Sequence, residues 1–467
     1  MAITKRRFKV GALVNNIVNY FSFYSVLYFL RKSIKIGSLV IICPNGQTYK
    51  VGDEKCEMSK IVTVRVYDWN FFQSVALEYD LGLAKSFILG EWGLVEDNDA
   101  SDKLLSLFYL FVKNRDTKNS KMSYSKMISS WIGYTINFWV YRLNMDNSLN
   151  RSLKNIHLHY DLSNDLFTRF LDKKYLVYSS AIFEAKLENT GNLERNGSHY
   201  VKPSSNPEKS LVLSGSLEDA QIRKLDLLLE KCRVEKCHKL LDIGFGWGGI
   251  AIRAAQTIGC KVWGITLSIE QKKLAEKKVE EAGVGHLVTF ELVDYRIFSK
   301  RHSGEFDRII SCEMIEAVGH NHLSKYFAAI ENLLAEDGIF VMEAITTPES
   351  RYKEYLKSTD FINTIIFPGS CCPSLHALIE AMANNSRLSL EGFENINVHY
   401  AKTLFEWRKN FNQNYEQIRK FGFDDQFRRC WNYYFCYCEA GFASQTEGCL
   451  ILTFSRPGNR ALFPYSE

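Results

Sequence analysis

The chain has 467 residues, which is enough for two or three domains, each with a sizeable core. A hydrophobic content of 46% and an aromatic content of 13% exclude a mostly disordered chain. The net charge of +5 suits contact with an anionic surface but fits an ordinary solvated surface as well, so we expect no nucleic-acid partner. Twelve cysteines without a C-x-x-C pair indicate reduced thiols in a cytoplasmic protein and no metal site.

The first forty residues combine an apolar run, residues 10–30, with basic flanks. The basic residues before and after the run are Lys5, Arg6, Arg7, Lys9, Arg31, Lys32 and Lys35. Apolar residues recur in the run at helical spacing, which predicts a helix. Two interpretations stay open: a basic amphipathic helix in a membrane interface, or a helix packed on its own domain. A cleaved signal peptide is less favoured, because no small-residue cleavage site follows.

The next segment reads as a small α+β domain. Strands are predicted at residues 38–43, 48–51 and 61–66, and helices over 70–113 with a break around residues 90–92. We place the end of this domain near residue 150, so that it covers residues 1–150. A later stretch, residues 185–216, is rich in Asn, Ser, Gly and Pro, and we interpret it as a long polar surface insertion.

From residue 219 onward, strands alternate with helices, which is typical of an α/β fold with a mostly parallel sheet covered on both faces. The expected strands are residues 239–243, 261–266, 288–292, 308–312, 339–345, 393–399 and 449–454. Ligands of such sheets bind beyond the carboxyl ends of the strands. The residues expected at those ends, and so in one cleft, are Gly244, Thr266, Asp294, Glu316 and Ile345.

The turn after the first of these strands is rich in glycine. Asp242 ends the strand, and Gly244, Gly246 and Gly248 follow in the pattern D-x-G-x-G-x-G. This pattern favours S-adenosylmethionine over a dinucleotide. A bound pyrophosphate requires small side chains in this turn, whereas the chain has Trp247 there. The alternative is a tight turn in some other α/β domain.

The second and third strands lead to further candidate ligands of the cofactor. In dinucleotide enzymes an acid commonly closes the second strand and holds the ribose. Here Thr266 and Gln271 stand near that position and offer hydrogen bonds instead. After the third strand, Tyr295 and Arg296 are placed to meet an adenine ring.

Seven motifs then recur in the order found in cyclopropane-fatty-acyl-phospholipid synthases. They are residues 159–167, 178–181, 244–249, 264–268, 313–320, 367–369 and 399–404. The chain resembles that family from about residue 10 to its end. The eukaryotic, plant-like members look closest, judging by residues 455–459 and the polar insertion, and the mycolic-acid methyltransferases share most of the motifs.

The resemblance implies a class I S-adenosylmethionine-dependent methyltransferase with a Rossmann-like sheet in residues 151–467. It adds Tyr178, Ser179 and Leu267 to the cofactor-binding candidates. It also implies methyl transfer to a cis double bond of an unsaturated phospholipid in a membrane, with a carbocation that loses a proton as the cyclopropane ring closes. The N-terminal domain is then expected to assist membrane contact or dimerisation, so a homodimer stays open and the protein is expected to be peripheral to the membrane.

The same resemblance names a site for bicarbonate, the expected proton acceptor. Glu316, Tyr400 and the backbone of Ile345 match the family, whereas Ser180 and Glu343 replace the cysteine and histidine of bacterial members. Glu343 either donates a proton to bicarbonate, or replaces it as the base, or points away. Two rival functions stay open: C-methylation of the acyl chain without ring closure, and a catalytically inactive lipid-binding homologue.

Overall fold

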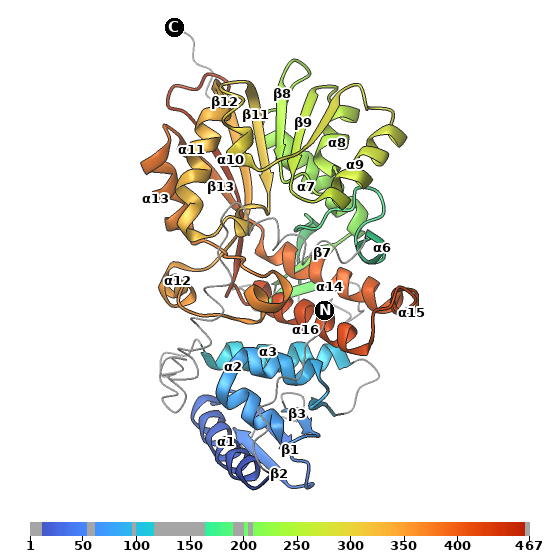
Figure 1. Cartoon of the computed structure of the whole chain (residues 1–467), viewed down its shortest axis with the longest axis vertical. Helices are drawn as coiled ribbons and strands as arrows, with labels where there is room; N and C mark the ends of the chain where they lie inside the picture. The colour runs from blue at the N-terminus through green and yellow to red at the C-terminus, as the bar shows by residue number, and fades with distance from the viewer. Residues whose placement is uncertain are drawn as a thin grey trace. The chain divides into compact units, whose positions relative to one another are not determined.

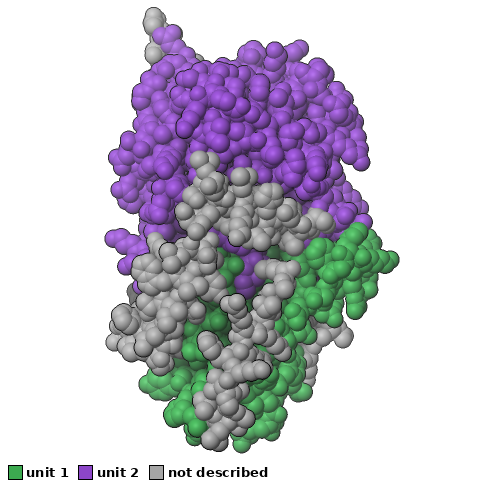
Figure 2. Space-filling view, viewed as in Figure 1, with its two compact units in different colours: residues 1–143, 358–364, 415–444 green, residues 144–357, 365–414, 445–467 purple. Residues whose placement is uncertain are grey.

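The structure is a computed structural model that describes residues 12–53, 61–95, 100–115, 164–189, 200–203 and 209–462. Contacts divide the chain into two compact units (Figure 2). Unit 1 contains residues 1–143, 358–364 and 415–444, and unit 2 contains the rest. The expected boundary near residue 150 and residues 159–163 of the first motif lie outside the described residues. Residues 415–444, which the sequence-based division assigns to the catalytic domain, group with unit 1.

Unit 1 contains a four-stranded sheet of order β2-β1-β3-β4 (Figure 1). Its strands are β1 Ser38–Ile42, β2 Thr48–Gly52, β3 Ile61–Val66 and β4 Trp92–Leu94. Its α-helices are α1 Ala12–Ser33, α2 Asn70–Ile88, α3 Ala100–Arg115, α15 Tyr415–Arg419 and α16 Asp425–Ala443. The helix break expected around residues 90–92 contains the start of β4. The first three strands agree with the sequence-based prediction to within one residue.

Aromatic side chains hold the helices of unit 1 together. Tyr433 of α16 is buried, and its ring lies 5.7 Å from Phe87 of α2, 5.0 Å from Phe108 of α3 and 4.8 Å from Phe361. Such edge-on and tilted ring pairs stabilise beyond the area they bury. The late segment 415–444 therefore packs as part of the core of unit 1.

Unit 2 is built on a seven-stranded sheet of order β10-β9-β8-β11-β12-β14-β13. The strands are β8 Lys239–Ile243, β9 Lys261–Thr266, β10 Val288–Leu292, β11 Phe306–Cys312, β12 Leu334–Thr346, β13 Ser389–Asn395 and β14 Gly448–Ser455. The first five run parallel, and β14 lies antiparallel between β12 and β13. This is the mostly parallel, Rossmann-like α/β sheet that the alternation of strands and helices predicts.

Helices cover both faces of this sheet (Figure 1). On one face lie α7 Leu217–Lys231, α8 Gly249–Thr257 and α9 Ile269–Glu281, and on the other lie α10 Tyr295–Phe298, α11 Leu323–Leu333 and α13 Leu375–Asn385. Ser216, Ser268 and Ser374 cap α7, α9 and α13 by accepting a backbone N–H of the first turn. The remaining helices of unit 2 are α6 Asn164–Phe167, α12 Glu349–Tyr355 and α14 Asn397–Gln413.

One sequence-based expectation for unit 2 needs correction. The strand expected at residues 393–399 ends at Asn395, and residues 397–399 open helix α14. The described parts of the stretch 185–216, which the sequence predicts as a polar insertion, form a three-stranded sheet of order β5-β7-β6. These strands are β5 Glu184–Asn189, β6 Tyr200–Pro203 and β7 Lys209–Ser214. Val212 and Leu213 of β7 are buried, and their burial gives this sheet an apolar anchor that the polar composition conceals.

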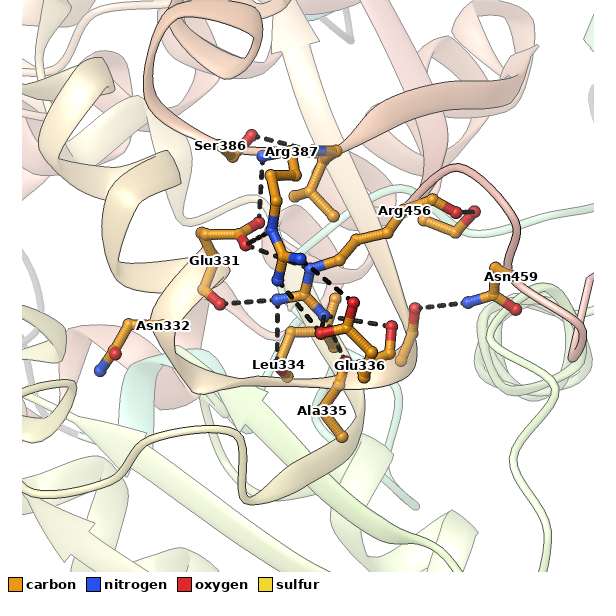
Figure 3. A network of polar contacts seen from close by, with 12 residues as sticks. Glu331, Asn332, Leu334, Ala335, Glu336, Ser386, Arg387, Arg456 and Asn459 are labelled. Atoms are coloured by element: carbon orange, nitrogen blue, oxygen red, sulfur yellow. Dashed lines mark hydrogen bonds and ion pairs between the residues drawn. The ribbon is translucent and has the colours of Figure 1, made fainter.

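The motif at residues 455–459 has a structural role in unit 2 (Figure 3). The guanidinium of Arg456 is buried, donates to the backbone carbonyls of Glu331 and Leu334, and pairs with the Glu331 carboxylate. Asn459 donates to the carbonyl of Gly338. These bonds satisfy carbonyls where α11 ends and β12 begins, so the motif fixes that turn rather than binding a ligand.

Within the described ranges, no helix combines the length and the apolar character that crossing a bilayer requires. The eleven cysteines in those ranges are free thiols.

Candidate active site

The glycine-rich turn joins β8 to α8 in backbone conformations that favour glycine. Gly244, Gly246 and Gly248 have φ values of +82°, +55° and +83°. A Cβ added to Gly244 would lie 2.8 Å from Cγ of Met314, whereas a Cβ added to Gly246 would meet no atom within 4 Å. Gly246 therefore leaves space beside the turn, where a ligand can approach the backbone closely.

Asp242, at the end of β8, is fully buried, and both of its carboxylate oxygens lack a hydrogen-bond partner among the described residues. Loss of solvent raises its pKa to about 7, although the nearby Lys224 acts in the opposite direction. A buried carboxylate without a donor is costly unless a ligand supplies one. The ammonium group of an amino-acid ligand is a donor of the required charge.

One cavity in unit 2 brings the cofactor candidates together. It is lined by ten of the eleven: Tyr178, Ser179, Asp242, Gly244, Gly246, Thr266, Leu267, Gln271, Tyr295 and Arg296. The eleventh, Gly248, does not line it. A Cβ there would lie 3.1 Å from the Phe290 ring and 3.3 Å from Ala275, so this glycine serves packing.

The polar groups at the second and third strand ends are held by local hydrogen bonds. The hydroxyl of Thr266 lies 3.3 Å from Oε1 of Gln271 and accepts the backbone N–H of Ser268. Arg296 forms a two-pronged ion pair with Asp294, at 2.8 Å and 2.7 Å. The guanidinium is thereby committed to Asp294, and Tyr295 presents the aromatic surface of this part of the cavity.

Beside this cavity lies a cluster of acids that gathers the catalytic candidates. Glu313, which follows β11 and lines the cavity, accepts the backbone N–H of Ser180 at 3.0 Å and the hydroxyl of Tyr400 at 2.6 Å. Glu316 accepts the backbone N–H of Ile345 at 2.6 Å. The Glu313 carboxylate therefore bonds two of the groups, Ser180 and Tyr400, that the sequence analysis assigns to an anion.

A buried ammonium group, that of Lys224, lies close to Glu343, another of the catalytic candidates. Nζ of Lys224, on α7, lies 3.6 Å from Oε2 of Glu343, and both side chains are 0% exposed. Lys224 also donates to the hydroxyl of Ser179, and the Cys312 thiol lies 3.2 Å from both Ser179 and Glu343. Glu343 thus has a counter-charge within the protein, and the network links it to Ser179 in the wall of the cavity.

The acids perturb one another's protonation. Loss of solvent, followed by repulsion from Glu343 and Glu316, holds the pKa of Glu313 well above its ordinary value. Loss of solvent raises the pKa of Glu316 to about 7. The pKa of Lys224 is raised too, because the attraction of Cys312 and Glu343 outweighs the opposing effect of burial. Strongly perturbed acids beside a cavity are typical of functional sites.

Sequence reasoning missed two members of this site. Glu313 stands in one of the recurring motifs, three residues before Glu316, but nothing in the motif marks it as a partner of Tyr400. Its φ of +46°, rare for a residue with a side chain, is visible only in the structure. Lys224 sits in an ordinary amphipathic helix, and its sequence context carries no signal of complete burial.

Comparisons with known proteins show the family to which the chain is related. Residues 147–451 match the family described as mycolic acid cyclopropane synthetase. The tuberculostearic acid methyltransferase UfaA1 of Mycobacterium tuberculosis is 38% identical over 299 residues, and the match covers 64% of each chain. The chain thus spans slightly less than two thirds of that relative.

Two further proteins are similar over most of their own length. The cyclopropane-fatty-acyl-phospholipid synthase of Escherichia coli is 29% identical over 420 residues, which is 88% of this chain and 94% of that one. The mycolic acid cyclopropane synthase CmaA1, solved in complex with SAH and CTAB, superposes with a TM-score of 0.52 at 27% identity. That superposition covers 65% of this chain and 98% of the other.

Proposed function

The chain belongs to the mycolic acid cyclopropane synthetase family, and from that premise we propose that it forms cyclopropane rings on unsaturated acyl chains of phospholipids. Its cosubstrate is S-adenosylmethionine, and its class is that of the S-adenosylmethionine-dependent lipid methyltransferases. Beyond this class and cosubstrate, we propose that the substrate is a phospholipid, that the ring closes, and that a particular group takes the proton.

The residues present fit the cosubstrate. Asp242 offers an unpaired buried carboxylate to its amino-acid end, Gly246 leaves space for close approach, and Tyr295 offers a ring to its adenine. When bound, S-adenosylmethionine supplies an electrophilic methyl group. Tyr178 in the cavity wall packs 5.1 Å from Trp407 and 5.2 Å from Phe167, so the site has the aromatic surface that stabilises positive charge.

The observation that carries the mechanism is the position of the Glu313 carboxylate. One carbon of the acyl double bond gains the methyl group, and its neighbour becomes a carbocation. The electrons of a methyl C–H bond then close the ring, and the proton leaves to a base. Glu313 is the proposed base, because Tyr400 and the Ser180 N–H hold its carboxylate in place and donate to its ionised form, which is the form that accepts a proton.

Glu316 and Glu343 have supporting roles in this proposal. Glu316 binds the backbone of Ile345 and adds negative charge next to the developing cation, while Glu343 is neutralised by Lys224. A bound bicarbonate is then unnecessary, since a side-chain carboxylate already occupies the hydrogen bonds of Ser180 and Tyr400. The ion pair counts against Glu343 as the base and favours a role that the sequence analysis did not consider, that of a structural counter-ion of Lys224.

The strongest alternative is C-methylation without ring closure. The same carbocation can shift a hydride and lose its proton to leave a methylene branch, and UfaA1, a similar chain, is named a methyltransferase. An inactive lipid-binding homologue is the weaker alternative, because the acids and the glycine turn are all present. To test the function, the chain is expressed in a bacterium that lacks its own synthase, and its fatty acids are analysed.

Cyclopropane and methylene products are isomers of equal mass, so chromatography against standards and proton NMR must separate them. Cyclopropane fatty acids confirm the proposed reaction. Methylene or methyl-branched acids establish the alternative, and unmodified acids from a folded protein that binds S-adenosylmethionine establish the inactive homologue.

The base is tested by chemical rescue. Glu313→Gln removes the proton acceptor and should lower turnover by about 100-fold or more, the usual worth of general base catalysis. Glu313→Gly opens the space between the Ser180 N–H and Tyr400, so added bicarbonate should restore part of the activity of this variant. Added bicarbonate should not restore the activity of Glu313→Gln, in which the amide still fills that space. The exposed Glu336→Gln is the control. Full activity of Glu313→Gln in carbonate-free buffer would remove Glu313 from the mechanism.

A further inference from the structure

Helix α1 in unit 1 has one buried side and one exposed side, and both are apolar. Phe23, Val26 and Leu27 are buried. The exposed side chains, at 49–67% exposure, are Ile17, Tyr20, Phe21, Tyr24 and Tyr28. Their spacing of one, three or four residues places these five on one face of the helix, hereafter the aromatic face. The ring of Tyr20 lies 4.7 Å from that of Tyr24 and 6.0 Å from that of Phe21, so these three rings adjoin one another.

Basic residues extend the aromatic face at its C-terminal end. Arg31 and Lys32 follow Tyr28 at helical spacing and are exposed, as is Lys35, and Nζ of Lys32 lies 5.7 Å from the Tyr28 ring. The first 52 residues contain eight lysines and arginines and no aspartate or glutamate, so the rest of the chain carries a net charge of −3. Positive charge is therefore concentrated in the segment that carries the exposed rings.

We propose that the aromatic face of α1 and its basic end bind the surface of an anionic lipid bilayer. Tyrosine suits the interface between water and acyl chains, because its ring is apolar and its hydroxyl is polar. Arginine and lysine beside it attract anionic headgroups. The helix lies on the membrane in this arrangement, and the inference does not depend on the methyl-transfer chemistry of unit 2.

Charge favours a bilayer over a second copy of the chain as the occupant of this face. A two-fold dimer would place the same surface against itself. Since residues 1–52 hold no acid, α1 of a second copy offers nothing to pair with Arg31 or Lys32. An anionic membrane supplies both the negative charge for the basic end and an apolar layer for the rings.

The aromatic arm of the test measures binding to vesicles by sedimentation. The vesicles contain phosphatidylglycerol and phosphatidylcholine with saturated chains, so that no double bond can engage the active site. Phe21, Tyr24 and Tyr28 are changed to serine together, and the partition coefficient should fall at least tenfold. The control is the serine triple variant at exposed apolar residues of unit 2, Leu187, Leu292 and Phe393, which should bind as the unchanged chain does.

The charge arm changes Arg31, Lys32 and Lys35 to glutamine. Each cation near an anionic surface strengthens binding about fivefold, so the triple variant should bind up to about 100-fold more weakly and lose most of its salt dependence. Changing the exposed Lys261, Lys325 and Lys420 to glutamine gives the same net charge and should have little effect. Phosphatidylcholine vesicles alone should bind all variants weakly.

Size-exclusion chromatography and S-adenosylmethionine affinity, measured on the same samples, show that each variant is folded. Two results would overturn the inference. One is equal vesicle binding by the aromatic variant and the unchanged chain. The other is a shift from dimer to monomer in the aromatic variant without any loss of vesicle binding, which would assign the face to a second copy.

Discussion

Because Asp242 is buried, we predict that Asp242→Asn stabilises the fold and weakens the binding of S-adenosylmethionine. Its pKa lies at about 7 in the folded chain, against an ordinary value of 3.8, because burial disfavours the charge. A folded-state pKa that is raised means that the folded chain holds the proton more tightly than the unfolded chain. Asp242 therefore costs no stability below about pH 4 and costs increasingly more as the pH rises toward 7.

The magnitude follows from the two pKa values. One pKa unit corresponds to about 1.36 kcal/mol, so the ionised carboxylate lowers the free energy of unfolding by about 4 kcal/mol above pH 7. Asp242→Asn removes the charge but leaves a buried amide without partners, at about 1–3 kcal/mol. The net gain at pH 8 is about 2 kcal/mol, which raises the melting midpoint by about 5 °C.

Thermal unfolding between pH 5 and pH 9, together with calorimetry of S-adenosylmethionine, checks both halves of this prediction. The stabilisation should shrink toward pH 5, and affinity should fall about 10- to 100-fold through loss of a charge-assisted hydrogen bond. The exposed Asp337→Asn is the control and should change neither quantity. Unchanged affinity in Asp242→Asn would refute the assignment of Asp242 to the ligand's ammonium group.

Two further predictions concern the turn and the ion pair of the site. Gly246→Val should abolish S-adenosylmethionine binding in a folded protein, because valine resists a φ of +55° and would fill the space beside the turn. Calorimetry measures this affinity, and an unchanged value would contradict the prediction. Lys224→Met should lower the free energy of unfolding by about 3–5 kcal/mol, since it leaves Glu343 charged and unpaired, whereas adding Glu343→Gln should recover part of that loss. Urea unfolding of both variants measures this, and a double variant no more stable than Lys224→Met would rule out a coupled pair.

The sequence was most informative where local chemistry decides the structure. Strands 239–243 and 288–292 and the glycine turn between β8 and α8 were predicted to the residue, because a short apolar run before glycine and a run of alternating apolar and polar residues leave few alternatives. Parallel strands then bring their carboxyl ends to one edge of the sheet, which is why ten of the eleven cofactor candidates share a cavity.

The sequence was least informative where contacts between distant parts of the chain determine the local structure. Residues 397–399 carry alternating apolar and polar character that fits a strand, yet they form the first turn of α14, where Asn397 is buried and accepts the N–H of Cys449. The burial of Lys224 depends on Cys312 and Glu343, which are 88 and 119 residues further along the chain. No local pattern encodes such contacts.

Charge balance explains why this site should favour positively charged species. Burial, together with repulsion from Glu343, raises the pKa values of Glu313 and Glu316, and the ammonium group of Lys224 forms its ion pair with Glu343. The pKa of Asp242 is raised as well, so among the described residues these acids favour holding protons unless another positive charge is present. In the proposed reaction, a sulfonium donor and then a carbocation would supply the missing positive charge. The cost of ionising these buried acids would then be offset by their attraction to the charged reactant and to the cation that forms from it.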